Sequence, residues 1–196
     1  MATAWPDSLY PAGLEWRLMK AGTQFRSPFT GSLQAIDFVG EYWSVRMQFK
    51  GEGARRPFSP LLDSWLGYLA GGVNQTDVYH WARPIPIGTM RGSPTVQTTT
   101  ARGQSQLLIT TTTGWTLLAG DLIKAGTQVF MVRQDCTASA SLLTVPLVNR
   151  IRGVINSGSA VTWDRPKLTV VMPEMSGGVV YRPGMTLPSE VEFVEP

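Results

Sequence analysis

The clearest hydrophobic pattern in the chain lies in residues 33–49. In residues 42–49 every second side chain is apolar, and these side chains are Trp43, Val45, Met47 and Phe49. A period of two is typical of a strand with one buried face. Residues 33–38 form a second run, and the glycine-containing connection 39–41 predicts that the two runs make a β-hairpin. An isolated hairpin is marginally stable in water, so we expect other elements to cover its apolar face.

Residues 59–70 are the stretch with helical periodicity. Ser59 suits the N-cap, Pro60 suits the first helical position, and Gly71 with Gly72 ends the helix. One apolar stripe is formed by Leu61, Leu62, Trp65, Leu66 and Leu69. Because so short a helix is not stable alone, we expect it to pack on the apolar face of the hairpin.

Further strands are predicted on both sides of these segments. Residues 14–19 alternate and predict a first strand, whereas residues 73–92 contain prolines and predict an irregular edge strand. Residues 167–172 and 190–195 predict two strands near the C-terminus. A small second unit that is complete by about residue 163 does not need these two strands, so we expect them to return to the N-terminal module.

Short strands separated by turns fill the segment between these parts. The predicted strands are 107–112, 122–124, 128–133 and 142–148. Strands of this length and spacing predict a small barrel or sandwich.

The sequence therefore predicts a mainly β protein with two domains. Residues 1–93 plus 165–196 would form a split β-barrel or sandwich module with one packed α-helix. Residues 94–164 would form an inserted small β-barrel of the SH3 or OB type.

Composition limits the classes of function. The 196-residue chain carries a net charge of +3 without a stripe of lysine and arginine, so it lacks the charge pattern of a nucleic-acid-binding protein. Its one cysteine, Cys136, excludes an intrachain disulfide. No apolar run approaches the roughly 18 residues of a membrane span, and the N-terminus lacks a signal-peptide pattern. We therefore expect synthesis in the cytoplasm and no contact with a membrane.

Residues suited to catalysis or metal binding are few. His80 is the sole histidine, so a Ser-His-Asp triad depends on it alone, and a packing or surface role is favoured between Tyr79 and Trp81. One histidine and one distant cysteine do not have metal-ligand spacing. The acidic residues allow glycosidase-like pairs but single out none. The basic loop 51–57 lacks a phosphate-binding motif and predicts a solvated or subunit-facing loop. We expect no catalytic residue, no cofactor and no metal, and a protein that is not an enzyme.

Aromatic residues outside the predicted core are candidates for contact with partners. Core packing accounts for Trp16, Trp43 and Trp65, which leaves Trp5, Trp81, Trp115 and Trp163 for interfaces. The candidate subunit-interface residues are Trp5, Tyr10, Trp81, Ile85 and Ile87. Residues 1–13 are either an arm on a neighbouring subunit or a coil packed on their own domain. Exposed tryptophans could also stack on sugars, so binding of host glycans is a second hypothesis.

Four runs of the sequence resemble those of a known protein class. They are SPFTGSLQAIDFVGEYWSVRMQF, SPLLDSWLGYLAGG, LLAGDLIKAGTQVFMVRQD and SEVEFVEP. Together they resemble bacteriophage and prophage tail proteins of the distal tail type, which lie where the tail tube meets the host-recognition tip. The resemblance implies a split β-barrel with one helix that assembles into a six-fold ring around the tail channel. It also implies a smaller β domain on the outside of the ring.

The resemblance implies a structural function in the virion. We expect an oligomeric ring, a hexamer, that joins the tail tube to the host-attachment apparatus at the tail tip and is assembled in the host bacterial cytoplasm. The expected partners are copies of the chain and the tube, tape-measure and tip or hub proteins. DNA would only pass through the channel, which the small net charge permits. The alternative is a tail-tip module that binds a host glycan or receptor.

Overall fold

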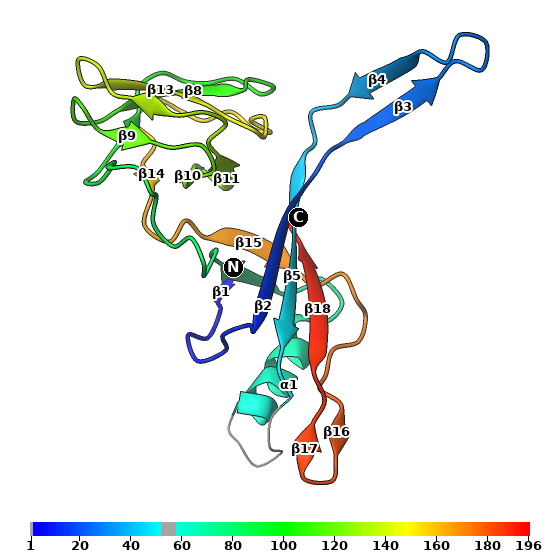
Figure 1. Ribbon diagram of the computed structural model, residues 1–196. Helices are drawn as coiled ribbons and strands as arrows, with labels where there is room; N and C mark the ends of the chain where they lie inside the picture. Colours follow the sequence, from blue (N-terminus) through cyan, green and yellow to red (C-terminus); the bar gives the residue numbers. More distant parts are fainter. Residues whose placement is uncertain (1, 52–57) are drawn as a thin grey trace. The chain divides into compact units, whose positions relative to one another are not determined.

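The computed structural model describes residues 2–51 and 58–196 (Figure 1). The chain is mainly β, and the described residues contain one α-helix, as the sequence predicts. The strands form several sheets in a sandwich-like fold, and within the described part of the chain no sheet closes into a barrel. The predicted basic loop lies outside the described residues except for Gly51.

The chain divides into two compact units. The first unit comprises Met1–Arg17, Trp43–Val78 and Leu168–Pro196, and the second comprises Leu18–Tyr42 and Tyr79–Lys167. The predicted division instead places residues 18–42, 79–93 and 165–167 with the N-terminal module. Compactness does not show which segments fold independently, so the predicted domain bounds stay a prediction.

A six-stranded sheet forms the first unit, in the order β1-β6-β15-β18-β5-β2. The strands are β1 (Thr3–Ala4), β2 (Gly13–Met19), β5 (Tyr42–Phe49), β6 (Gln75–Val78), β15 (Leu168–Val171) and β18 (Ser189–Val194). Because β15 pairs with β6 and β18 pairs with β5, the two C-terminal strands return to the N-terminal sheet as predicted. The edge strand predicted in residues 73–92 is wrong, because β6 lies between β1 and β15. A further short hairpin in this unit consists of β16 (Tyr181–Arg182) and β17 (Met185–Thr186).

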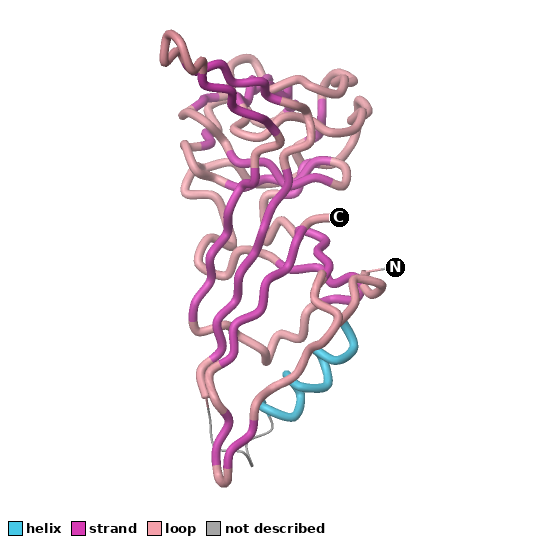
Figure 2. The backbone as a smooth tube through the Cα atoms, turned by 90° about the vertical axis from the view of Figure 1, so that its right-hand side faces the viewer, coloured by secondary structure: helices cyan, strands magenta, loops and turns pink. Residues whose placement is uncertain are grey.

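Helix α1 (Phe58–Leu69) belongs to the first unit and lies alongside its strands (Figures 1 and 2). The predicted apolar face of β5 is buried in full, and Phe49 at its end contacts Phe58 of the helix, with 6.1 Å between ring centroids. The helix buries Leu62, Leu66 and Leu69, each of which stabilises the fold by about 1.5–3 kcal/mol. Its buried stripe is narrower than predicted, because Leu61 is exposed.

The predicted hairpin between residues 33–38 and 42–49 is wrong. Strand β4 (Leu33–Asp37) pairs with β3 (Gly22–Arg26), with Gly22 opposite Asp37 at one end of the ladder and Arg26 opposite Leu33 at the other. The chain reverses at residues 27–32, where Gly31 has a φ of 68° and donates its N–H to the Ser27 carbonyl oxygen. Residues 39–41 connect β4 to β5, and these two strands do not pair with each other. The glycine at the turn of this hairpin is Gly31, before β4, and not Gly40, after it.

The second unit contains three small sheets besides the β3–β4 hairpin. Their orders are β13-β8-β7, β11-β10-β14 and β12-β9. The strands are β7 (Thr95–Val96), β8 (Gln106–Thr110), β9 (Thr116–Leu117), β10 (Leu122–Ala125), β11 (Gln128–Met131), β12 (Cys136–Thr137), β13 (Leu142–Pro146) and β14 (Val161–Thr162). The four predicted strands correspond to β8, β10, β11 and β13, whereas the two-residue strands were not predicted.

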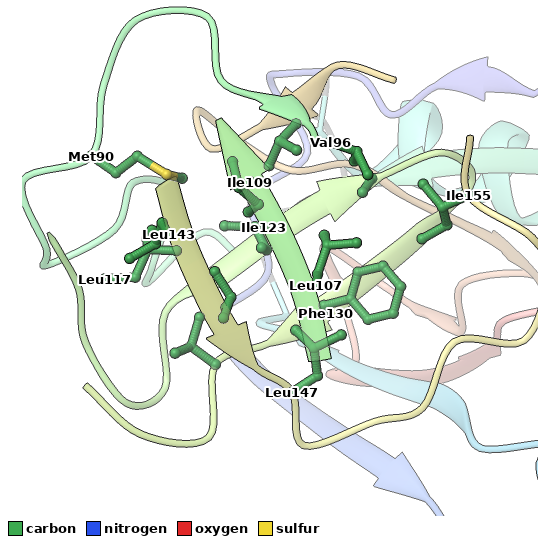
Figure 3. Close-up of a cluster of buried hydrophobic side chains, with 14 of the residues drawn as sticks. Met90, Val96, Leu107, Ile109, Leu117, Ile123, Phe130, Leu143, Leu147 and Ile155 are labelled. Carbon is green, nitrogen blue, oxygen red and sulfur yellow. The ribbon is translucent and has the colours of Figure 1, made fainter. Parts of the chain in front are cut away.

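Side chains from these sheets meet in one buried cluster (Figure 3). Ile109 of β8, Ile123 of β10 and Phe130 of β11 are fully buried in it, together with Leu143 of β13. A core made by the inner faces of two sheets is the arrangement of a β-sandwich. The second unit therefore has its own hydrophobic core.

Two glycines of the first unit offer a matched test of this packing. Gly67 lies on the exposed side of α1, where an added Cβ meets nothing within 4 Å, so Gly67→Ala should raise the free energy of unfolding by about 0.5–1 kcal/mol. A Cβ on Gly177 would lie 2.5 Å from the Leu66 carbonyl oxygen, so Gly177→Ala should lower it by about 1–3 kcal/mol. Urea unfolding followed by tryptophan fluorescence measures both, and equal effects would contradict the packing described.

Candidate assembly surface

The described residues contain no cluster suited to metal binding. No group of three or more His, Cys, Asp and Glu side chains that could hold a metal ion occurs among them. Burial raises the pKa of Cys136, so its thiol is protonated at neutral pH and is a poor nucleophile. In the part of the chain that the structure describes, no helix is long and apolar enough to cross a membrane.

His80 is held by an arginine in the second unit. Its Nε2 lies 3.2 Å from Nη2 of Arg83, and arginine has only donors, so Nε2 accepts this hydrogen bond. Burial, and to a smaller extent the charge of Arg83, lower the pKa of His80 to about 4. The imidazole is therefore neutral at pH 7 and packs in the fold, as the sequence favours.

Of the predicted interface residues in the first unit, Trp5 is buried and Tyr10 is exposed. Trp5 is only 7% exposed, stacks on Phe49 at 6.2 Å and meets Phe193 edge-on at 5.7 Å. Its indole N–H donates to the Leu9 carbonyl oxygen at 2.7 Å. Trp5 therefore belongs to the core of the first unit, and its side chain does not face solvent. An aromatic residue beside a proline does not by itself indicate an interface arm.

The other predicted interface residues lie in the second unit, in an irregular segment. Trp81 is half-buried against Tyr79, whereas Ile85 and Ile87 are exposed. The buried carboxylate of Asp121 accepts the N–H of Ile87 at 2.8 Å and the N–H of Gly88 at 3.1 Å. This bonding fixes the backbone that presents Ile87. No local motif marks this contact, because Asp121 lies 33 residues from Gly88.

The β3–β4 hairpin has one apolar face. Residues opposite each other in an antiparallel ladder share a face, so Phe25 shares one with Gln34, and Ile36 shares the same one with Thr23. Phe38, two residues after Ile36, continues this face because its N–H bonds to Ala21. Every residue of both strands is exposed. We call the surface formed by Phe25, Ile36 and Phe38 the hairpin face.

The opposite face of the hairpin is mostly polar. It carries Gln24, Arg26, Leu33, Ala35 and Asp37.

The phenylalanines of the hairpin are strongly exposed. Phe29 at the tip is 95% exposed, Phe25 is 62% exposed and Phe38 is 54% exposed. An aromatic side chain has about 150–250 Å² to bury, so the three phenylalanines leave on the order of 400 Å² in solvent. That area matches the largest apolar patches of ordinary monomers, which are often functional.

A buried carboxylate fixes the base of the hairpin within the second unit. Glu41, just after β4, is 2% exposed, and its Oε2 accepts the N–H of Arg150 at 2.5 Å. The Arg150 guanidinium lies 3.5 Å from Oε1 of Glu41 and 2.7 Å from Oδ1 of Asp37, and it donates to the Phe38 carbonyl oxygen at 2.9 Å. Lys20, two residues before β3, lies 3.3 Å from Glu41. Both strands of the ribbon are thus tied at its base.

Tryptophans are not the exposed aromatic residues of this chain. All seven lie within the described ranges, and each is buried or half-buried. Trp115 and Trp163, which were candidates for interfaces, pack against the core of the second unit. The exposed aromatic residues of the hairpin are phenylalanines instead. The sequence analysis did not single them out, because it expects the helix to cover the apolar face of a hairpin made by residues 33–49. No family model matches the chain, and no curated protein matches it.

Acidification should destabilise the second unit through His80. Its folded pKa of about 4 lies below the ordinary 6.5, so between these values the unfolded chain binds a proton that the folded chain does not. The stability that the neutral imidazole contributes is thus complete above about pH 6.5 and is lost as the pH falls toward 4, by up to about 3 kcal/mol. Urea unfolding at pH 7 and 4.5 measures this loss. His80→Gln should show less of it, and an unchanged loss would contradict the assignment.

The two carboxylates around Arg150 should contribute very unequally. Glu41→Ala leaves the Arg150 N–H and guanidinium without their buried acceptor, so it should lower the free energy of unfolding by about 3–5 kcal/mol. Asp37→Ala removes an exposed partner of the same guanidinium and should cost less than about 1 kcal/mol. Urea unfolding of both variants makes the comparison. Similar losses would show that Glu41 does not anchor the hairpin.

Proposed function

We propose that the chain is a structural subunit of a phage tail tip that assembles with copies of itself into a ring, expected to contain six subunits. The ring joins the tail tube to the host-attachment apparatus. The four sequence runs that resemble distal tail proteins support this proposal. The structural observation that carries it is the hairpin face, an apolar surface that no described residue covers.

The hairpin face favours assembly because a two-stranded ribbon is marginally stable in water by itself. The Glu41–Arg150 contacts fix only its base, and they leave Phe25 and Ile36 in solvent. The same ribbon becomes stable when another surface covers its apolar side. A subunit that functions inside an assembly has such a surface permanently, whereas a free enzyme does not.

A ring requires two different surfaces on each subunit, because in a head-to-tail contact one surface of a subunit binds the other surface of its neighbour. The hairpin face is one such surface, and the segment with Ile85 and Ile87, fixed by Asp121, is a further exposed apolar segment for contact with neighbouring proteins. A net charge of +3 would allow DNA to pass a channel without strong attachment. The tube, tape-measure and tip or hub proteins are the expected neighbours.

Binding of a host glycan receives less support. Sugar-binding sites combine exposed aromatic rings with hydrogen-bonding side chains, whereas the seven tryptophans are buried or half-buried. The exposed rings of the hairpin belong to phenylalanine, and Phe25 and Phe38 share their face with Ile36. This surface suits an apolar protein partner better than a polar sugar.

Particles produced from the genome that encodes this chain test the proposal. Gold labelling of an affinity-tagged chain in electron micrographs should place it at the tail tip, and images of the tip should show a ring. Light scattering of the purified chain should give a species of about six times its 21.5 kDa mass. A chain that is absent from particles, or that labels the capsid, would overturn the proposal.

A further inference from the structure

The outer side of helix α1 is a second apolar surface, and its composition is unusual for a helix facing water. Surface helices normally carry charged residues on their outer side. In α1 the sole charged residue is Asp63, whose carboxylate accepts the N–H of Val179 at 2.8 Å. The exposed positions include Leu61 and Tyr68, and Trp65 lies half-buried between them.

This surface continues beyond the C-terminal end of the helix. The Trp65 and Tyr68 rings lie 5.6 Å apart, which makes one aromatic surface along the helix. Met175 is exposed, and its sulfur lies close to Gly71, just past the last turn. We call the surface of Leu61, Trp65, Tyr68 and Met175 the helix face.

We infer that the hairpin face of one subunit docks on the helix face of a second copy of the chain. Both faces are apolar, and neither includes a charged side chain. A charged partner surface would lose its hydration on either face without gaining an opposite charge. The two faces differ from each other, so their contact is head-to-tail and leaves one free face of each kind on every pair of subunits.

The extent of the two faces favours contact with each other. A stable interface buries about 800 Å² on each partner, and its centre is enriched in aromatic residues. The hairpin phenylalanines supply on the order of half of that area on one side. Trp65 and Tyr68 supply aromatic anchors on the other side, and anchors of the two partners tend to pair.

This inference rests on the self-assembly in the proposed function and names the surfaces that carry it. The two can fail separately. Copies that join through these faces without occurring in tail particles would leave the inference standing and remove the proposed function. A tail-tip ring whose subunits join elsewhere would do the reverse.

Three variants with exposed substitutions test the contact. The hairpin variant carries Phe25→Thr and Ile36→Thr, and the helix variant carries Leu61→Gln and Tyr68→Gln. The matched control carries Gln24→Thr and Ala35→Thr, which change the opposite face of the same ribbon. Circular dichroism and urea unfolding at subunit concentrations that keep the chain monomeric confirm that each variant folds.

Light scattering should separate these variants by association. The hairpin and helix variants should each associate about 30-fold more weakly than the wild-type chain, or weaker still, as expected when central aromatic anchors are lost. The control should assemble like the wild-type chain. Equal weakening in the control would show that substitution in the ribbon, and not loss of the hairpin face, disturbs assembly, and it would overturn the inference.

An equimolar mixture of the two defective variants gives the sharpest result. The helix variant keeps a functional hairpin face and the hairpin variant keeps a functional helix face, so one contact can form between them. The mixture should therefore contain a species of about twice 21.5 kDa and nothing larger, although each variant alone is monomeric. A mixture that stays monomeric overturns the inference, because it shows that the two faces do not bind each other.

A photo-cross-linker extends the test to assembled particles. With p-benzoylphenylalanine at position 25, mass spectrometry should find cross-links to the helix face of another copy. The same group at position 24, on the opposite side of the ribbon, should not reach it. Cross-links from position 25 to another hairpin or to a different tail protein overturn the inference. So does a wild-type chain that stays monomeric when concentrated and gives no copy-to-copy cross-link in particles.

Discussion

The constraint on which the architecture depends is that two strands alone cannot bury the apolar face they create. Strands β2 and β5 meet this constraint inside a six-stranded sheet, where the alternating side chains of β5 are covered. Strands β3 and β4 pair only with each other among the described residues, and Phe25 and Ile36 lie together on one face. The apolar side chains of the hairpin face therefore stay in water. Burying them would stabilise the protein by about 25 cal/mol for each Å² of apolar surface covered.

The buried Glu41 explains how such a hairpin keeps a defined position within its own unit. A carboxylate taken out of water is costly unless its oxygens are fully bonded, and here a backbone N–H, a guanidinium and an ammonium surround it. Arg150 also bonds to Asp37 and to the Phe38 carbonyl, so one arginine joins the end of β4 to the rest of the second unit. Polar bonding fixes the base of the ribbon, while the apolar residues beyond it stay available.

Local pattern predicted the elements of this fold better than their partners. The strand 42–49, the helix and the two C-terminal strands follow from alternation, capping residues and apolar spacing that act within a few residues. The pairing of strands depends on distant residues. Strand β5 pairs with β18, which lies more than a hundred positions away in the sequence, and not with the neighbouring β4. Trp5 was assigned to an interface because nothing local shows that Phe49 and Phe193 enclose it. Bonds such as those of Asp121 and Glu41 join backbone groups that no sequence motif marks.

The two faces of the hairpin together limit what its exposed phenylalanines can do. An exposed apolar strand pair is an aggregation hazard when both faces and both edges accept partners. Here one face carries Arg26 and Asp37, whose charges oppose a second apolar layer. Each ribbon then accepts one partner on one side. If that partner is a different surface of an identical chain, every subunit contacts one neighbour through its hairpin face and the other neighbour through the second surface. The angle between these two contacts then sets the number of subunits in the ring.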